Sequence, residues 1–572
     1  MKRFVVTFVA CFLAVIFAAV IPILVIAGKA SQPPKVKKGS WLVLHLEGPL
    51  PEYPATAMLP PPLGGQEMSL TDVLEALEKA KVDDRIEGVL VRLGGLGAGA
   101  ATHEEIRNAI HRYRTGGKKI YAWGEYIDRS SYLIASACDS IFMLPTGGLR
   151  WTGAAAITPR AKRMFEKLDI KPDIDQIERY KSAAELVTRE DMSPEAREET
   201  TRLLTTMHEV ILGVVARERG LSPADVESAM VQALFSAEEA KAARFVDALE
   251  YWQTIEDRLK GKDEKLKTIG LTKYAEIERG SVGLKGKKKI GVVHAIGLIG
   301  GRHSGMNPLL GRTMGSDTVV GDLKRAMEDD DVAAVIFRVD SNGGESVTSD
   351  LIGHQVERVK SKKPIVVSMV DVAASGGYSI AYRGSAILAD TTTVTGSIGS
   401  ISGKFNARGL YAKLGITFDA VAVGPNALFW SGVDDWTDEQ RAIHHKDHWA
   451  SYNQWIADIA RARGLTAAEV DSVGRGRVWL GPEAVERKLI DGLGDFDAAV
   501  ARAKELAGVD ADAKVSLVHY PARKNFFEAL VSGGMPEAID LLLDRWAAAR
   551  IGEIREAMSE PLSWQVLQPI EN

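Results

Sequence analysis

Two residues far apart in the chain have side chains suited to nucleophilic catalysis. Ser375 stands in Ala373-Ala374-Ser375-Gly376-Gly377-Tyr378, between an apolar strand-like segment at 364–370 and a helix-compatible segment at 378–382. The first N–H groups of a helix have no acceptor within the helix, so a serine at this junction would have oxyanion donors beside it. Lys181 lies far upstream, in Tyr180-Lys181-Ser182-Ala183. A desolvated lysine can serve as the base that a serine nucleophile needs.

Two further motifs contain glycines and a hydroxyl that could complete such a site. Gly343-Gly344 follows a predicted strand, and glycine lets the backbone approach a substrate without a Cβ in the way. The N–H groups of Gly344 and Gly376 could then stabilise an oxyanion. Ser397, in Thr395-Gly396-Ser397-Ile398-Gly399-Ser400, offers a hydroxyl that could orient the lysine amine.

Histidine-based and metal-based chemistry are the alternatives within this sequence. His294, His303 and His354 lie in the same half as Ser375, but none stands in a recognisable triad motif, and no Gly-x-Ser-x-Gly elbow is present. His444, His445 and His448 have helical spacing, look like surface residues and give only a weak indication of metal binding. No phosphate loop or dinucleotide fingerprint occurs, so we expect neither a metal nor another cofactor.

The composition is that of a large globular protein, and the net charge and the cysteine count bear on which partners and covalent links to expect. The chain has 572 residues, of which 46% are hydrophobic and 26% are charged. A net charge of −5 gives no reason to expect a nucleic-acid partner. With only two cysteines, Cys11 and Cys138, a disulfide framework is excluded.

The N-terminal segment has the length of a membrane span. Residues 4–27 contain no charged side chain, and 24 residues of helix are long enough to span a hydrocarbon core of about 30 Å. The apolar stretch is longer than that of a cleaved signal peptide, so we expect a single uncleaved anchor. Basic residues occur on both sides of the segment, and a simple count of them by the positive-inside rule would place the large domain in the cytoplasm. Long domains translocate largely regardless of such charges, so a body outside the cytoplasm stays possible.

The chain contains two copies of one unit. Residues 233–249 reappear as 477–493, with the apolar positions, a glutamate and an aspartate in register. Upstream, the strand-like segments 86–92 and 119–123 have counterparts at 332–338 and 364–368. Short apolar strands alternate with helical segments in each half, which predicts an α/β fold with a mostly parallel sheet covered on both faces.

The two halves differ where the chemistry is expected. Aligning Tyr132 with Tyr378 places Arg129 at the position of Ser375, so the first half lacks the nucleophile. No counterpart of the motif around Lys181 is found in the second half. Duplication followed by division of labour explains this pattern, with one half supplying the base and the other the nucleophile.

These motifs and the duplicated length resemble the signal peptide peptidase (SppA) family in its long form, from the N-terminal segment to about residue 520. The resemblance implies a membrane-anchored serine endopeptidase related to the crotonase and Clp protease folds. By resemblance, Ser375 is the nucleophile, Lys181 the general base and Ser397 the residue that hydrogen-bonds the lysine. Gly376 and a glycine of the pair Gly343-Gly344 match the oxyanion hole.

One position departs from the family pattern. The family usually has proline where this chain has Asn342, which puts the rigidity of that loop in question but not the activity.

We therefore predict two tandem crotonase/Clp-like α/β repeats after a single transmembrane helix. The predicted divisions are 1–30 for the anchor, 31–285 for the first repeat, 286–520 for the second and 521–572 for a helical tail. By resemblance, the protein degrades cleaved signal peptides through an acyl-enzyme, is a homotetramer, and lies in the inner (plasma) membrane with its catalytic body on the periplasmic side. An acyl-CoA enzyme of the crotonase fold and a catalytically silent membrane scaffold are the alternatives. Whether Lys181 and Ser375 meet within one chain or between chains stays open.

Overall fold

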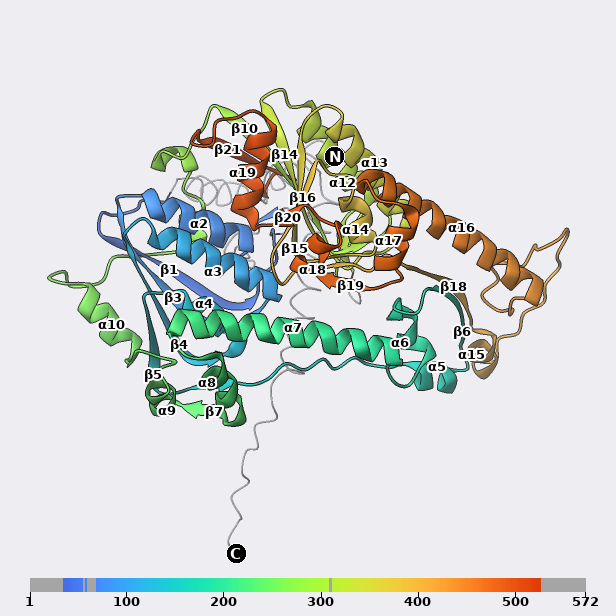
Figure 1. Ribbon diagram of the computed structural model, residues 1–572, viewed down its shortest axis with the longest axis horizontal. Helices are drawn as coiled ribbons and strands as arrows, with labels where there is room; N and C mark the ends of the chain where they lie inside the picture. Colours follow the sequence, from blue (N-terminus) through green and yellow to red (C-terminus); the bar gives the residue numbers. More distant parts are fainter. Residues whose placement is uncertain (1–33, 55–56, 59–67, 308–310, 526–572) are drawn as a thin grey trace, which may run out of the picture.

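The computed structural model describes residues 34–54, 57–58, 68–307 and 311–525 (Figure 1). The expected membrane segment at 4–27 lies outside the described residues, as does the tail beyond residue 525. Among the residues that the structure does describe, we find no helix with the length and apolar character needed to cross a membrane.

The first repeat is built on a seven-stranded sheet with the order β7-β5-β4-β3-β1-β9, and β8 pairs with β5. All its pairs are parallel except β5 with β7. Its strands are β1 (Ser40–Pro49), β3 (Ile86–Gly97), β4 (Lys119–Asp128), β5 (Ser140–Trp151), β7 (Ala233–Ser236), β8 (Ala248–Leu249) and β9 (Thr268–Gly270).

The second repeat has an eight-stranded sheet with the order β19-β17-β15-β14-β10-β21, extended by β16 and β20. It is parallel except where β17 meets β19. Its strands are β10 (Lys288–Ile296), β14 (Val332–Ser341), β15 (Ile365–Ala374), β16 (Ala386–Ala389), β17 (Val394–Gly396), β19 (Val478–Leu480), β20 (Gly492–Leu493) and β21 (Val515–Tyr520). The predicted α/β class and the mostly parallel sheets are confirmed, while the predicted residue boundaries of the repeats stay predictions.

Helices cover both sheets, and several begin at the caps expected from their sequences. Ser193 accepts the N–H of Ala196 just before the longest first-repeat helix, and Thr437 forms a capping box with Gln440 before its counterpart. The helices of the first repeat are α2 (Leu70–Val82), α3 (Ala100–Arg114), α4 (Arg129–Ser136), α5 (Lys162–Leu168), α6 (Glu185–Thr188), α7 (Pro194–Arg219), α8 (Pro223–Ser228), α9 (Ala237–Ala242), α10 (Trp252–Leu259) and α11 (Leu271–Ala275). Those of the second are α12 (Ser316–Glu328), α13 (Ser346–Lys360), α14 (Gly376–Ala381), α15 (Arg408–Lys413), α16 (Asp438–Arg463), α17 (Ala467–Val473), α18 (Gly481–Glu486) and α19 (Phe496–Leu506).

The remaining elements are short strands that lie off the two main sheets. A three-stranded sheet and two strand pairs contain β11 (Leu298–Ile299), β12 (Gly305–Asn307), β13 (Gly311–Met314), β6 (Lys171–Ile177), β18 (Ser400–Asn406), β2 (Ala57–Met58) and β22 (Lys524–Asn525).

Equivalent side chains make equivalent hydrogen bonds in the two repeats. The hydroxyl of Tyr132 donates to the carbonyl of Phe245 at 2.6 Å, and that of Tyr378 donates to the carbonyl of Leu489 at 2.9 Å. An arginine at the end of the long helix pairs with an aspartate at 2.7 Å in each repeat: Arg219 with Asp247, and Arg463 with Asp491. The duplication seen in the sequence is therefore also a duplication of packing.

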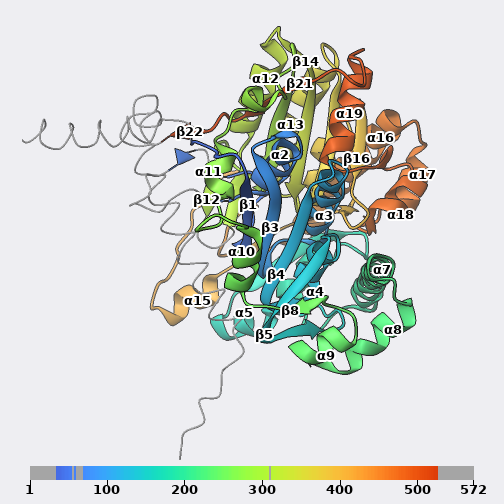
Figure 2. The same ribbon diagram turned by 90° about the vertical axis from the view of Figure 1, so that its left-hand side faces the viewer.

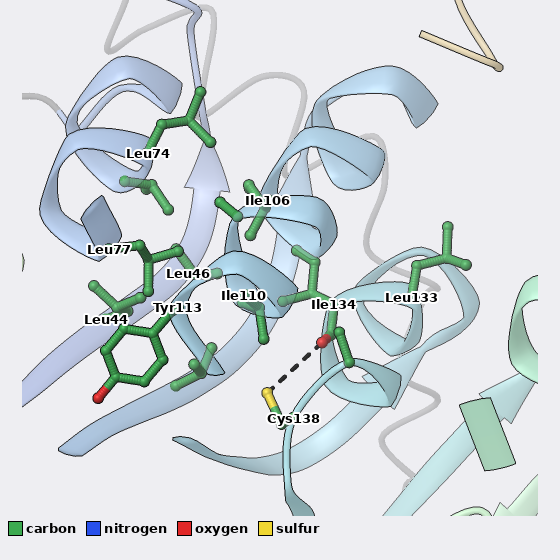
Figure 3. Close-up of a cluster of buried hydrophobic side chains, with 14 of the residues drawn as sticks. Leu44, Leu46, Leu74, Leu77, Ile106, Ile110, Tyr113, Leu133, Ile134 and Cys138 are labelled. Carbon is green, nitrogen blue, oxygen red and sulfur yellow. Dashed lines mark hydrogen bonds between the residues drawn. The ribbon is translucent and has the colours of Figure 1, made fainter. Parts of the chain in front are cut away.

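The two repeats share one interior. Figure 3 shows the first-repeat part of this core, where side chains of α2, α3 and α4 cover β1 and the Cys138 thiol is buried among them. The same cluster continues into the second repeat through Ile336 on β14, Val366 on β15 and Phe496 at the start of α19. Figure 2 shows the strands of the first sheet side by side, with α2 and α3 toward the second repeat. The two units are consequently fixed relative to each other by apolar burial.

A buried ionic cluster joins the repeats beside the strand that leads to the Gly343-Gly344 loop. Arg338 on β14 is fully buried and donates to Glu52 at 2.7 and 2.9 Å and to Glu105 at 2.8 Å. Both carboxylates come from the first repeat. Removing one partner would leave an uncompensated buried charge, which is strongly unfavourable.

A two-stranded antiparallel arm also crosses between the repeats. β6 of the first repeat pairs with β18 of the second, from Lys171 opposite Asn406 to Ile177 opposite Ser400. The arm lies at the right-hand end of Figure 1, with α5 and α15 beside it. Lys181 follows β6 by a few residues, so this pairing directs the chain of the first repeat toward the second.

Candidate active site

Ser375 occupies the turn between β15 and α14. Its backbone has φ 56° and ψ −119°, which is a strained conformation for a residue with a side chain. The turn is fixed because the Ser375 N–H donates to the carbonyl of Gly396 at 2.8 Å and the Ser375 carbonyl accepts from the N–H of Ser379 at 2.9 Å. A strained strand-to-helix turn of this kind presents a serine hydroxyl outward for attack.

Lys181 reaches the Ser375 hydroxyl within one chain. Its Nζ lies 2.8 Å from Ser375 Oγ, although the two residues come from different repeats. The same Nζ lies 2.9 Å from Ser397 Oγ and 3.0 Å from the Ser397 carbonyl oxygen. The structure thus brings together the three side chains that the sequence nominated and pairs Ser375 with Lys181 inside a single protomer.

The surroundings of Lys181 favour its neutral form. The side chain is 7% exposed, and this burial lowers the pKa of Lys181 to about 8, while the charge of Glu199 acts in the opposite direction. A neutral amine has two N–H donors and one lone pair. The two oxygens of Ser397 can accept the donors, which leaves the lone pair to accept the proton of Ser375. The geometry can therefore support general-base activation of a serine.

Two backbone N–H groups are placed to bind an oxyanion. Gly376 is the first residue of α14, and its N–H has no acceptor within the helix. A Cβ built on Gly376 would lie only 3.0 Å from the nitrogen of Gly344, so the two amides are close together. Gly343 differs, because its N–H donates to Ser341 Oγ at 3.1 Å. Gly344 is therefore the better oxyanion donor of the predicted pair.

The loop before these amides is held without the proline usual in the family. Ser341 Oγ donates to the Gly297 carbonyl at 2.6 Å and accepts the N–H of Gly343. Asn342 itself is exposed, and the backbone on either side of Gly344 is bonded to Ile299. The loop's shape comes from these contacts, so Asn342 does not leave it unsupported.

Sequence reasoning missed a loop that packs on Lys181. Gly476 has φ 82°, and a Cβ there would lie 2.3 Å from the backbone nitrogen of Lys181. The Gly476 N–H donates to the Ile398 carbonyl at 2.7 Å, and the Ser397 N–H donates to the Arg477 carbonyl at 2.6 Å. The run Gly474-Arg475-Gly476-Arg477 was the available signal, since paired glycines often mark a close backbone approach.

The histidines that formed the alternative site lie elsewhere. His294 contacts His519 at 2.9 Å and stacks on Tyr53, while His303 and His354 are exposed. Among the residues described by the structure, no histidine is hydrogen-bonded to Ser375.

The histidines on α16 require a correction. We expected a surface group, but His444 and His448 are buried because they pack against the arm, and only His445 is exposed. His444 contacts Ser402, and both His445 and His448 contact Asp175. Within the described part of the chain, no three His, Cys, Asp or Glu side chains are grouped to hold a metal ion.

The corresponding turn of the first repeat has lost these features. Asp128 caps α4 there, and Arg129 stands at the position of Ser375. One of its guanidinium nitrogens lies 3.3 Å from His208 Nδ1. An arginine in this position is no nucleophile, which agrees with a single reactive centre per chain.

Fold and site together define a serine hydrolase built from two copies of one α/β unit. The profile of peptidase family S49 matches residues 112–267 and 357–510, one stretch in each repeat. The chain is 29% identical over 506 residues to the chloroplastic serine protease SPPA of Arabidopsis thaliana, covering 87% of this chain and 74% of that one. It is 30% identical over 504 residues to Protease 4 of Salmonella typhi, covering 84% and 80%.

The chain therefore belongs to peptidase family S49, and it is a serine peptidase. The two matched stretches confirm the predicted tandem repeats. Solved structures that match include ClpP1 of Listeria monocytogenes, at 13% identity over 36% of this chain and 94% of that one, with a TM-score of 0.24. That score is too low to add to the account of the fold.

Proposed function

We propose that Ser375 and Lys181 form the catalytic dyad of an endopeptidase that works through an acyl-enzyme. The 2.8 Å contact between Lys181 Nζ and Ser375 Oγ is the observation that carries this proposal. Neutral Lys181 takes the hydroxyl proton while Oγ attacks the peptide carbonyl. The oxyanion that forms accepts N–H bonds from Gly344 and Gly376. The protonated Lys181 then gives its proton to the departing amine, so the peptide C–N bond breaks and an ester to Ser375 remains.

Hydrolysis of that ester uses the same groups. A water molecule gives a proton to Lys181 and adds to the ester carbonyl, and the second oxyanion occupies the same pair of amides. Collapse breaks the bond to Ser375 Oγ, which regains its proton from Lys181, and the product leaves as a carboxylic acid that ionises in water. Ser397 accepts from the lysine throughout and keeps the amine aimed at Ser375.

Cleaved signal peptides are the substrate class that we propose. A relative from Enterococcus faecium, 30% identical over 184 residues, is called a putative signal peptide peptidase SppA. The uncharged stretch at 4–27 supports tethering to a membrane, where such apolar remnants remain after export. We place the catalytic body on the periplasmic side of the inner (plasma) membrane. Family S49 membership disfavours an acyl-CoA enzyme, and an assembled dyad disfavours a silent scaffold.

The substrate proposal is tested with matched peptides. We expect a peptide with the apolar core of a signal sequence to be cleaved with kcat/KM at least about tenfold higher than a variant carrying two lysines in that core. A site that takes up an apolar core would have to bury each added charge, which costs more than burying the residue that the lysine replaces. Mass spectrometry of the products, with Ser375→Ala protein as the control, gives both rate and cleavage site. Equal rates for the two peptides would remove the support for signal-peptide substrates.

We further propose that the protein forms a homotetramer through copies of its own arm. Residues 165–173 and 411–419 align without a gap, so 417–423 corresponds to β6 and 154–160 corresponds to β18. In one chain both segments lack a strand partner and are largely exposed. Ile157, Val421 and Val423 are 95%, 94% and 89% exposed, whereas Ile177, the counterpart of Val423, is buried.

This contrast supports a head-to-tail contact. Pairing 417–423 of one copy with 154–160 of the next would repeat the contact that β6 makes with β18. It would also cover apolar side chains that are otherwise in water. Such a heterologous contact closes into a ring when its rotation permits.

Cysteine cross-linking tests the contact. The register of β6 with β18 places residue 157 opposite residue 420, as Gly403 lies opposite Ile174. In protein without its two native cysteines, Ile157→Cys combined with Ala420→Cys should form disulfides between chains, with covalent products up to four chains long. Mixing the two single variants should give dimers only, and each single variant alone serves as the control. A double variant that stays monomeric under oxidation would contradict the pairing.

A further inference from the structure

Glu199 is a buried carboxylate close to the dyad that the mechanism above does not use. It lies in the second turn of α7 and is 6% exposed. A carboxylate is rarely buried unless its charge is compensated or its hydrogen bonds are made. The contacts that Glu199 makes with neighbouring elements explain why it is buried.

The hydrogen bond of Glu199 is made to the strand beside Ser397. Its Oε1 accepts the N–H of Val478, the first residue of β19, at 2.8 Å. The preceding carbonyl, that of Arg477, accepts the N–H of Ser397 at 2.6 Å. Ser397 in turn accepts from Lys181 Nζ through both of its oxygens. A chain of backbone contacts therefore leads from Glu199 to the lysine amine.

The charge of Glu199 also acts on Lys181 directly. Burial lowers the pKa of Lys181, and the negative charge of Glu199 opposes this by favouring the ammonium form. Burial raises the pKa of Glu199 itself to about 7, against the Val478 N–H and the charges of Arg202 and Arg477. Glu199 is thus ionised in the range around pH 8 where Lys181 loses its proton.

The other charged groups around Glu199 are engaged elsewhere. Arg202, one turn along α7, pairs with Glu483 of α18, and Arg477 pairs with Glu198 on the exposed side of α7. Glu199 forms no ion pair among the described residues, so its charge is not neutralised by a contacting cation.

We infer that Glu199 is a positioning residue of the proposed dyad: it holds the start of β19 against Ser397 and its charge sets the pH at which Lys181 becomes a base. This inference rests on the proposed dyad. Glu199 would then be a residue of the first repeat that controls both the position of the Lys181 amine and the pH at which that amine loses its proton.

Glu199→Gln separates these two effects, because glutamine keeps an acceptor for the Val478 N–H but has no charge. We expect the midpoint of the kcat/KM profile against pH to move down by roughly 0.5 to 1 pH unit, since one nearby anion no longer favours the ammonium form. The high-pH plateau should stay within about threefold of wild type. The two profiles should converge in acid, where Glu199 of the wild-type protein is protonated as well.

Three comparisons make the outcome decisive. Glu209→Gln, which removes the same charge from α7 at an exposed site away from the dyad, should not move the midpoint. Glu199→Ala removes the acceptor too and should also lower the plateau. A lower plateau with an unmoved midpoint in Glu199→Gln would reduce Glu199 to a structural residue and overturn the inference. If the pH-dependent activity survives in Lys181→Ala protein, the dyad itself fails, which is a distinct result.

Discussion

Replacing Ser375 or Lys181 by alanine is expected to lower kcat/KM by about 10⁴-fold or more. In the proposed mechanism Ser375 Oγ forms the covalent bond to substrate, and within the described part of the chain Lys181 is the one side chain that is hydrogen-bonded to that oxygen. Members of such a unit act together, so the double variant should be little worse than either single variant. Peptide hydrolysis by the three purified variants, with thermal unfolding as the check on folding, measures both points.

A matched control separates loss of the base from loss of a buried lysine. Lys118 is half-buried, has a pKa lowered by burial, and donates to the carbonyls of Ala80 and Asp83, far from the site in the chain. Lys118→Ala should therefore keep the activity of the folded protein. Substantial hydrolysis by folded Lys181→Ala protein would show that another group is the base.

Replacing Gly344 by alanine is expected to lower kcat by roughly 10²- to 10³-fold, the range for losing one oxyanion donor. Gly344 has φ 148°, and a Cβ there would lie 1.9 Å from the carbonyl oxygen of Ile299. The loop must shift to relieve this contact. The Gly344 N–H then no longer points toward the oxyanion position that the Gly376 N–H faces. Because the ground-state substrate depends less on this bond, KM should change much less than kcat.

Gly300→Ala is the control for that variant. Gly300 directly follows Ile299, the last residue of β11, but a Cβ built on Gly300 meets no atom within 4 Å. Steady-state kinetics on both variants should show the loss in Gly344→Ala alone. A normal kcat in Gly344→Ala would remove Gly344 from the oxyanion hole.

Much of the second repeat follows from local sequence. The strand-like segment at 332–338 lies in β14, the one at 364–370 falls almost wholly within β15, and the helix-compatible segment at 378–382 overlaps α14. Parallel strands covered on both faces are continuous apolar runs, which makes them visible in a sequence. The difference between the repeats, with Lys181 in the first and Ser375 in the second, was also visible in the sequence, because the duplication lets one copy be compared with the other.

What the sequence could not reveal depends on contacts between distant segments. Gly476 is needed because the backbone of Lys181 passes over it; the glycines around residue 476 indicate a close approach, but they do not show which segment approaches. The Ser397 carbonyl faces the lysine because Ser397 has φ 52°, a backbone conformation that a serine in the sequence does not indicate. The sequence predicted that His444 and His448 are exposed, but both are buried where α16 packs against the arm.

The pH dependence of covalent labelling at Ser375 tests the central claim most directly. An organophosphorus serine probe should form a bond to Ser375 Oγ, and the labelled peptide can be identified by mass spectrometry. Because burial lowers the pKa of Lys181 to about 8 and only the neutral amine can take the proton, the labelling rate should be small in acid and rise with a midpoint near pH 8. Lys181→Ala protein should not be labelled at any pH in this range. Labelling of a different residue, or a rate that is already maximal at pH 6 and survives the loss of Lys181, would contradict the account.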